Sequence, residues 1–548
     1  MAVKNVRNGF GRCRNRPARA AKPRDTITVR GPAGPPTPPK EAFLTGCGPR
    51  CPWWQRGPAV RRPPHPPRHP AEFVLCYTVV KNWTQRRRRS MDASVMQGTE
   101  GAFARWVRKP YAPSAKHIPE LNGLRVLLVF IVSWYHFWQQ SWLTPHIGSV
   151  SLDFLVRSGY MPVDGTILLS GFLLFLPHAR AMLLGDPVPR VREFYQKRVM
   201  RIVPSYYFVT LLMLFVIALP GFWSNTSQGG VMSFGDRLEW IGETYQGDVL
   251  RYIGDWFGSL PAAYGGNTAS MWEDILRHLT FTQTFNYSTY VGTPIGVASW
   301  TIAIEMQAYL IFPLLAAGAR RNPLGAFSAM TAIALGFRCW CLWTLEDYNM
   351  VVNQLPNFLD VYAIGMAASL AYVKLTTLWP KDRNAQRLWS ALATLVLIAA
   401  VWGVTQTLRA QAGSSGTAGI QGGQMMRRPL FAALIAVVTL TLPFALRPIR
   451  FLMGNRLMGF LALISMNYYL MHQNLAVILK QRLQLPFSEQ YPAPNMASGG
   501  PDQPWAYQYT ALCFGGSLLV AILITFLIEK PGAWLLGRLF GRGRKMEA

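Results

Sequence analysis

Charged residues and cysteines are both sparse in this sequence, and each shortage narrows what the protein can be. Only 15% of its 548 residues are charged, whereas 50% are apolar. Several apolar runs approach the roughly 20 residues that a helix needs to cross a bilayer. The seven cysteines lack the spacing of a disulfide framework or a metal site. The sequence therefore predicts a multi-pass membrane protein in contact with the lipid bilayer, and we expect no metal.

Acidic residues are also few, and the net charge of +29 is unevenly distributed. Residues 1–90 hold 20 Lys and Arg against three acids, together with 15 prolines, and they lack the apolar core of a signal peptide. A segment of this composition cannot bury enough apolar surface to offset the entropy that it would lose on folding. We therefore assign residues 1–116 to a disordered basic Pro/Arg-rich region. Arg86–Arg89 could anchor it to anionic lipid or nucleic acid, but a segment without function is favoured, and we expect no nucleic-acid partner.

From residue 117 onward, apolar runs alternate with short polar breaks. Their length and spacing predict an all-α integral membrane domain over residues 117–537, followed by a basic tail at 538–548. About ten transmembrane helices are expected, at 124–143, 161–179, 202–221, 298–318, 324–344, 355–374, 388–406, 429–446, 457–479 and 509–529.

The basic residues predict how these helices are oriented. With the N-terminus inside, the inner loops and C-terminal tail hold 20 Lys and Arg, and the outer loops hold nine. Both termini are therefore expected in the cytoplasm of a cell-membrane protein. The long loop 222–297 then faces outward, and its length indicates a functional loop or a small cap. The two halves show no internal repeat, which weakens an assignment as a transporter built from inverted repeats.

Two ionisable residues interrupt the first apolar run, "LNGLRVLLVFIVSWYHFWQQSW". Arg125 and His136 are eleven residues apart, which places them on nearly the same helix face but about 16 Å apart in depth. An Arg near the inner boundary commonly extends its side chain to the interface. His136 lies deeper, where it needs a partner or a water-filled cavity. A structural hydrogen bond between helices is the alternative.

Two carboxylates and a basic cluster complete the candidate site. Asp164 and Glu305 are expected at about the depth of His136, where a carboxylate is costly and normally paired. The small pair Ser170 and Gly171 suggests close helix packing. A basic cluster precedes Pro204 on the cytoplasmic side. It is explained either by the positive-inside bias of membrane proteins or by a pocket for an anionic cofactor's phosphates. Its members are Lys197, Arg198 and Arg201.

These motifs together resemble the acyltransferase 3 family of membrane O-acyltransferases. The similarity rests on Arg125 and His136, "VDGTILLSGF", "RIVPSYY", "SWTIAIEMQAYLIFPLL", "ISMNYYLMHQNL" and "FLIEKPGAWLL". It implies ten helices, an acyl-CoA co-substrate used from the cytoplasm, and transfer of a short acyl group to a hydroxyl, often on a carbohydrate. We expect the acyl group to be acetyl in this chain. It also implies that Arg125 and His136 are required.

The expected roles follow from this resemblance and from the chemistry of acyl transfer. Arg125 would orient the donor, the basic cluster would bind its phosphates, and His136 would act as general base. Asp164 and Glu305 would orient or polarise His136 and bind the glycan or other exported or lipid-linked acceptor. The alternative is a proton-coupled secondary transporter in which His136, Asp164 and Glu305 form a relay.

Overall fold

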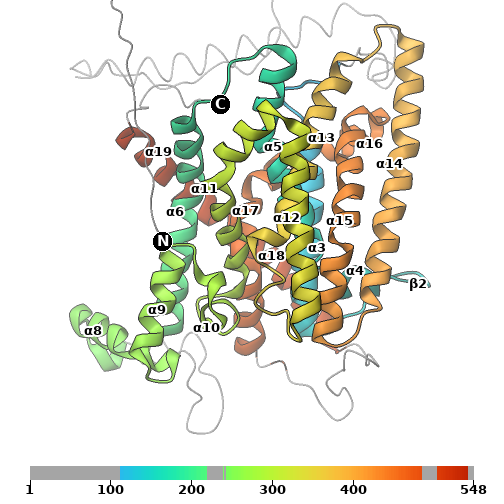
Figure 1. Cartoon of the computed structure of the whole chain (residues 1–548). Helices are drawn as coiled ribbons and strands as arrows, with labels where there is room; N and C mark the ends of the chain where they lie inside the picture. The colour runs from blue at the N-terminus through green and yellow to red at the C-terminus, as the bar shows by residue number, and fades with distance from the viewer. Residues whose placement is uncertain (1–111, 219–238, 240–241, 484, 486–502, 541–548) are drawn as a thin grey trace, which may run out of the picture. The chain divides into compact units, whose positions relative to one another are not determined.

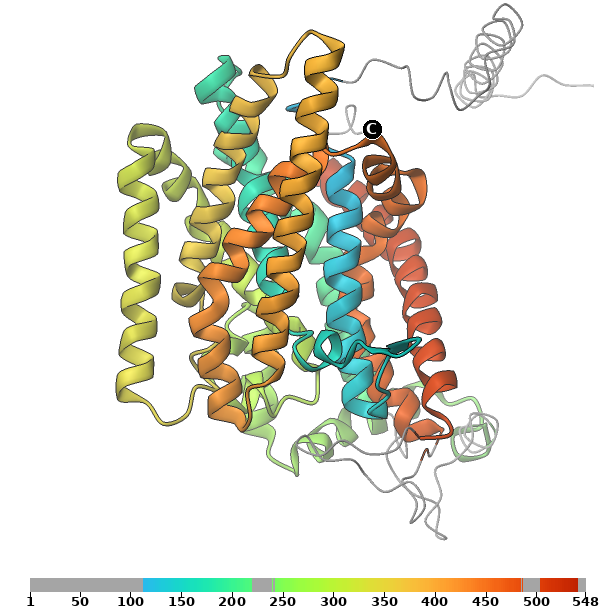
Figure 2. The same cartoon turned by 90° about the vertical axis from the view of Figure 1, so that its right-hand side faces the viewer.

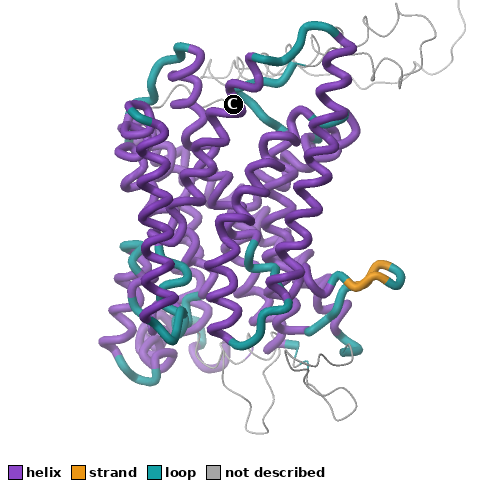
Figure 3. Tube along the Cα trace, turned by 45° about the vertical axis from the view of Figure 1, so that its right-hand side comes forward, coloured by secondary structure: helices purple, strands orange, loops and turns teal. Residues whose placement is uncertain are grey.

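The computed structural model describes residues 112–218, 239, 242–483, 485 and 503–540, and helices dominate this part of the chain (Figure 3). The predicted disordered region falls almost wholly outside these residues, as do residues 541–548 of the tail. In chain order the elements are α3 (Glu120–Ser141), β1 (His146–Ile147), β2 (Val150–Ser151), α4 (Asp153–Arg157), α5 (Pro162–Leu184), α6 (Val191–Ala218), α8 (Val249–Ser259), η1 (Leu260–Tyr264), α9 (Thr268–Leu279), η2 (Gln283–Phe285), α10 (Tyr287–Tyr290), η3 (Val297–Ser299), α11 (Trp300–Arg321), α12 (Pro323–Thr344), η4 (Leu355–Phe358), α13 (Leu359–Thr377), α14 (Arg383–Ala412), α15 (Thr417–Thr441), η5 (Leu442–Phe444), α16 (Arg447–Gly454), α17 (Arg456–Arg482), α18 (Ala506–Ile524), η6 (Thr525–Glu529) and α19 (Lys530–Leu539).

The predicted spans agree with this architecture. Within the described ranges, nine helices are long and apolar enough to cross a membrane. The pair α16 and α17, which meets at a 42° bend, brings the number to ten when it is counted as one span. Each predicted span overlaps one long helix, because runs of about 20 apolar residues satisfy their backbone hydrogen bonds internally only as helices. The cytoplasmic placement of the termini remains a prediction from the Lys and Arg distribution.

Close packing of α5 on α13 forms part of the core. A Cβ added to Gly365 would lie 2.4 Å from the carbonyl oxygen of Leu168, and one added to Gly171 would lie 3.0 Å from that of Tyr362. Small residues therefore let these two backbones approach, as expected for Gly171. On another side of α5, α3 packs beside α17 and α18 (Figure 2). Through these contacts α3 places its polar residues against several other helices.

Helices α8, α9 and α10 gather at one end of the bundle, opposite α16 and α19 (Figure 1). They belong to the stretch predicted as the long loop 222–297, of which 222–238, 240 and 241 lie outside the described residues. The described part of this loop is thus a small helical cap.

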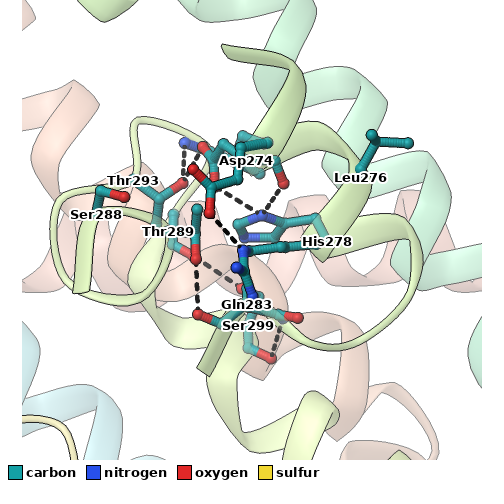
Figure 4. Close-up of polar contacts among 12 residues, drawn as sticks. Asp274, Leu276, His278, Gln283, Ser288, Thr289, Thr293 and Ser299 are labelled. Carbon is teal, nitrogen blue, oxygen red and sulfur yellow. Dashed lines mark hydrogen bonds and ion pairs between the residues drawn. The ribbon is translucent and has the colours of Figure 1, made fainter. Parts of the chain in front are cut away.

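A buried polar cluster holds the cap together (Figure 4). The imidazole Nδ1 of His278 lies 3.0 Å from Asp274 Oδ1, and Tyr264 and Thr293 donate to Asp274 Oδ2 over 3.0 and 2.7 Å. Burial, together with the Asp274 carboxylate, raises the pKa of Tyr264, so its hydroxyl stays a donor. Tyr206 of α6 donates to the His278 carbonyl over 3.0 Å, which fixes the cap to a transmembrane helix.

Candidate active site

A cavity of about 210 Å³ lies among α3, α5, α6, α11 and α17. Its charged lining residues are Arg125, Arg198, Arg201 and Glu305. Three guanidinium groups therefore face one carboxylate, and the cavity has a positive excess. Four of the seven predicted site residues come together here, although they lie on three separate helices.

Glu305 is held in place by two hydroxyl groups. Ser170 of α5 donates to its Oε1 over 2.9 Å, and Tyr309, one turn further along α11, donates to its Oε2 over 2.9 Å. Ser170 thus binds the carboxylate besides allowing the helices to approach. The Arg125 guanidinium is close enough to Glu305 and Arg201 for both charges to act on it.

Arg198 of α6 retains unused hydrogen-bonding capacity. The Arg198 guanidinium lies 5.6 Å from the ring centroids of both Phe194 and Tyr309, which hold it by cation–π contact. Its Nε is buried, with no hydrogen-bond partner in the part of the chain that the structure describes. Lys197 is exposed and lies outside the cavity lining. The predicted basic cluster is therefore divided, with two arginines inside and the lysine outside.

His136 does not line this cavity. Its Nδ1 lies 2.9 Å from Gln139 Oε1, and Gln139 in turn donates to the Tyr135 hydroxyl over 2.8 Å. An amide oxygen only accepts, so Nδ1 carries the hydrogen and Nε2 keeps its lone pair. The prediction that Asp164 or Glu305 orients His136 does not fit these contacts, because Gln139, one helical turn away, does so.

Asp164 belongs to a different arrangement. Its Oδ2 lies 3.1 Å from Arg428 Nε, and both side chains are fully buried. Arg428 also donates to the Val352 carbonyl over 2.9 Å. The predicted convergence of Asp164 with His136 and Glu305 is therefore not seen. An isolated carboxylate at this depth needs a counter-charge, and α15 supplies it.

A second buried pair adjoins the first. Arg338 binds Asp360 with both terminal nitrogens, over 2.7 and 2.6 Å, and contacts Asn357 through Nε over 2.6 Å. The Asn357 carbonyl accepts from Arg338 and, at 3.4 Å, from Arg428. We refer to the four charged residues as the buried ion-pair cluster; they are Asp164, Arg338, Asp360 and Arg428.

Sequence reasoning missed several residues around the site. It did not single out Gln139, Tyr309 or the basic partners of the buried carboxylates, because single polar residues in apolar runs do not reveal which helices pack together. His472 and Glu529 had a usable signal, since both lie in motifs that carry the family resemblance. Glu529 accepts from Asn467 over 2.6 Å and lies close enough to Arg201 for their charges to interact.

One of three comparisons with known proteins found a match. A family model described as an acyltransferase domain matches residues 118–528, which is most of the chain. Neither the comparison with curated proteins nor that with solved structures found a match. The matched segment includes the cavity, His136 and the cap, so the chain belongs to the acyltransferase 3 family of membrane proteins.

Proposed function

We propose that the protein is a membrane O-acyltransferase that moves a short acyl group, in the simplest case acetyl, from cytoplasmic acyl-CoA to a hydroxyl of a glycan or another exported or lipid-linked acceptor. The observation that carries this proposal is the cavity with three arginines and one glutamate. Guanidinium groups match phosphate oxygens in charge and geometry. Arg125, Arg198 and Arg201 would hold the donor's phosphates, with Lys197 as a peripheral charge.

The distance between the cavity and His136 suits such a donor. From Val129 in the cavity wall, α3 continues for seven residues, about 10 Å, to His136. Acyl-CoA carries its thioester at the end of a long pantetheine arm, so phosphates bound at the arginines would leave the acyl group free to extend toward the histidine.

The acyl-transfer step follows from the tautomer of His136. Its Nε2 lone pair takes the proton of the acceptor hydroxyl while the oxygen attacks the thioester carbonyl. The carbon–sulfur bond then breaks, and the proton reaches the departing thiolate or solvent. Gln139 keeps the hydrogen on Nδ1, so the Nε2 lone pair is available when the acceptor hydroxyl arrives.

The transporter alternative is weaker on this geometry. A relay needs His136, Asp164 and Glu305 within reach of one another, whereas Asp164 is paired with Arg428 and Glu305 accepts from Ser170 and Tyr309. Membranes containing the protein, incubated with labelled acetyl-CoA, should accumulate label in alkali-labile esters. Membranes containing His136→Ala should not. Proton-driven substrate flux without ester formation would favour the transporter instead.

A further inference from the structure

A second histidine lies beside the candidate base. His472, on α17, is fully buried, and its ring centroid is 5.1 Å from that of His136. The same ring is 5.1 Å from Tyr469, which lines the arginine cavity. His472 therefore contacts both a wall residue of the donor cavity and the histidine assigned to proton transfer.

The hydrogen bonding of His472 fixes where its proton lies. Its Nδ1 is 2.6 Å from the Tyr469 carbonyl oxygen, which can only accept, so Nδ1 carries the hydrogen and Nε2 the lone pair. This Nε2 is buried, with no hydrogen-bond partner among residues 112–218, 242–483 and 503–540. Buried acceptors are nearly always paired, so this lone pair is available to a donor that comes within reach.

The other titratable groups packed around His472 do not supply a charge. Tyr468 stacks on its ring at 6.2 Å with planes 6° apart, and Tyr469 contacts it from the next position of the same helix. On α18, Tyr509 and Cys513 share an apolar cluster with Phe137, which also contacts His472. Tyrosine and cysteine are neutral near pH 7.

We propose that His472 is the positioning partner of His136, a role that rests on the proposed function. When the acceptor's O–H bond breaks, the proton passes to His136 Nε2, and the oxygen's electron pair forms the new carbon–oxygen bond. The thioester's carbon–sulfur pair leaves on sulfur. Because the Nδ1–H of His136 is donated to Gln139, the unpaired Nε2 of His472 accepts a hydrogen bond from the new Nε2–H, directly or through one water. This contact stabilises the imidazolium until the proton reaches the thiolate or solvent.

Two substitutions at one position test this role. His472→Phe keeps an aromatic ring but removes the acceptor, whereas His472→Gln keeps an amide acceptor. Tyr468→Phe is the matched control, because it alters the neighbouring stack and leaves His472 intact. His472→Phe should lower kcat roughly 10- to 100-fold with little change in the KM for acyl-CoA. His472→Gln should recover part of that loss, and Tyr468→Phe should behave as wild type.

A direct titration separates this proposal from the acyltransferase assignment. In histidine-labelled protein followed by NMR, His472→Phe should move the protonation midpoint of His136 to lower pH, since the imidazolium loses an acceptor. An unchanged midpoint overturns the proposal even if esters form. If no esters form and the acyltransferase assignment fails, the protonation midpoint of His136 still shows whether His472 acts as its partner. If His472→Phe does not fold, the reciprocal variant His136→Ala must change the pH response of the His472 signal, and an unchanged response overturns the proposal.

Discussion

The arginine cavity and the buried ion-pair cluster contain the same kinds of residue and differ in two respects. In the cluster, two arginines meet two aspartates over 2.6 to 3.1 Å, and the side chains are at most 3% exposed. In the cavity, three arginines share one glutamate around about 210 Å³ of space. A site whose positive and negative charges balance and that encloses no cavity is structural. A site with an excess of positive charge around a cavity can hold an anionic ligand. The type of residue alone does not separate the two.

Breaking the cluster should have the largest effect, and the effect should be on stability. Arg338→Met leaves Asp360 buried without its counter-charge, which costs about 3 to 5 kcal/mol. We expect a large loss of folded protein, measured as yield and thermal unfolding in detergent. Arg201→Met in the cavity is the matched control, and it should unfold near the wild-type temperature. Equal destabilisation by both changes would remove the distinction between the two sites.

Asp164→Asn tests the other aspartate of the buried ion-pair cluster, which the sequence predicts to be catalytic. Its partner Arg428 is fully buried, so neutralising the carboxylate should lower stability and activity in parallel. The measurement is activity per folded molecule, with folding followed by size-exclusion chromatography. A stable Asp164→Asn protein with no turnover would restore the catalytic assignment.

His136 should affect turnover while leaving the fold intact. His136→Ala should lower kcat by roughly 10² to 10⁴, the usual contribution of a positioned acid or base, with normal insertion and acyl-CoA binding. The wild-type rate should fall as pH drops and His136 becomes protonated, because an imidazolium cannot accept the hydroxyl proton. That limb should vanish from the variant's pH profile. Full turnover in a well-folded His136→Ala protein would end its assignment as the base.

The cavity arginines should affect donor use more than acceptor use. Arg198→Gln or Arg201→Gln removes a charge-assisted contact worth about 1.5 to 3 kcal/mol and should raise the KM for acyl-CoA. Arg201→Lys should rescue only part of the loss, since lysine lacks the planar fork. Lys197→Gln is the control, because that side chain is exposed outside the cavity. A similar rise in KM for Lys197→Gln would indicate a diffuse surface effect instead.

The smallest effect is expected from the N-terminal region. Removing residues 1–90 should leave insertion and ester formation unchanged, because that segment has the composition of a disordered arm. Reporters fused after residues 190 and 383 should indicate the cytoplasm, and one within 230–270 should indicate the outside. Loss of activity on truncation would assign the arm a function, and an inward-facing cap would reverse the donor side.

The sequence predicted the positions of the helices better than it predicted which side chains contact one another. Apolar length defined the spans because each helix satisfies its own backbone, so α3, α5 and α11 fall close to the expected ranges. It also identified Arg125, Arg198, Arg201 and Glu305, since charges inside apolar runs are conspicuous. It could not tell that Asp164 pairs with Arg428, 264 residues away, because that contact depends on how helices pack. Gln139 was missed since an uncharged amide near a helix end is unremarkable.

A binding experiment with two ligands tests whether the cavity arginines bind the donor's phosphates. Coenzyme A and pantetheine differ by the phosphate-bearing nucleotide, so their affinities can be compared by calorimetry in the wild-type protein and in Arg201→Gln. Arg201→Gln should weaken coenzyme A binding by roughly 10- to 100-fold and leave pantetheine binding unchanged. Equal weakening of both ligands, or of neither, would contradict it.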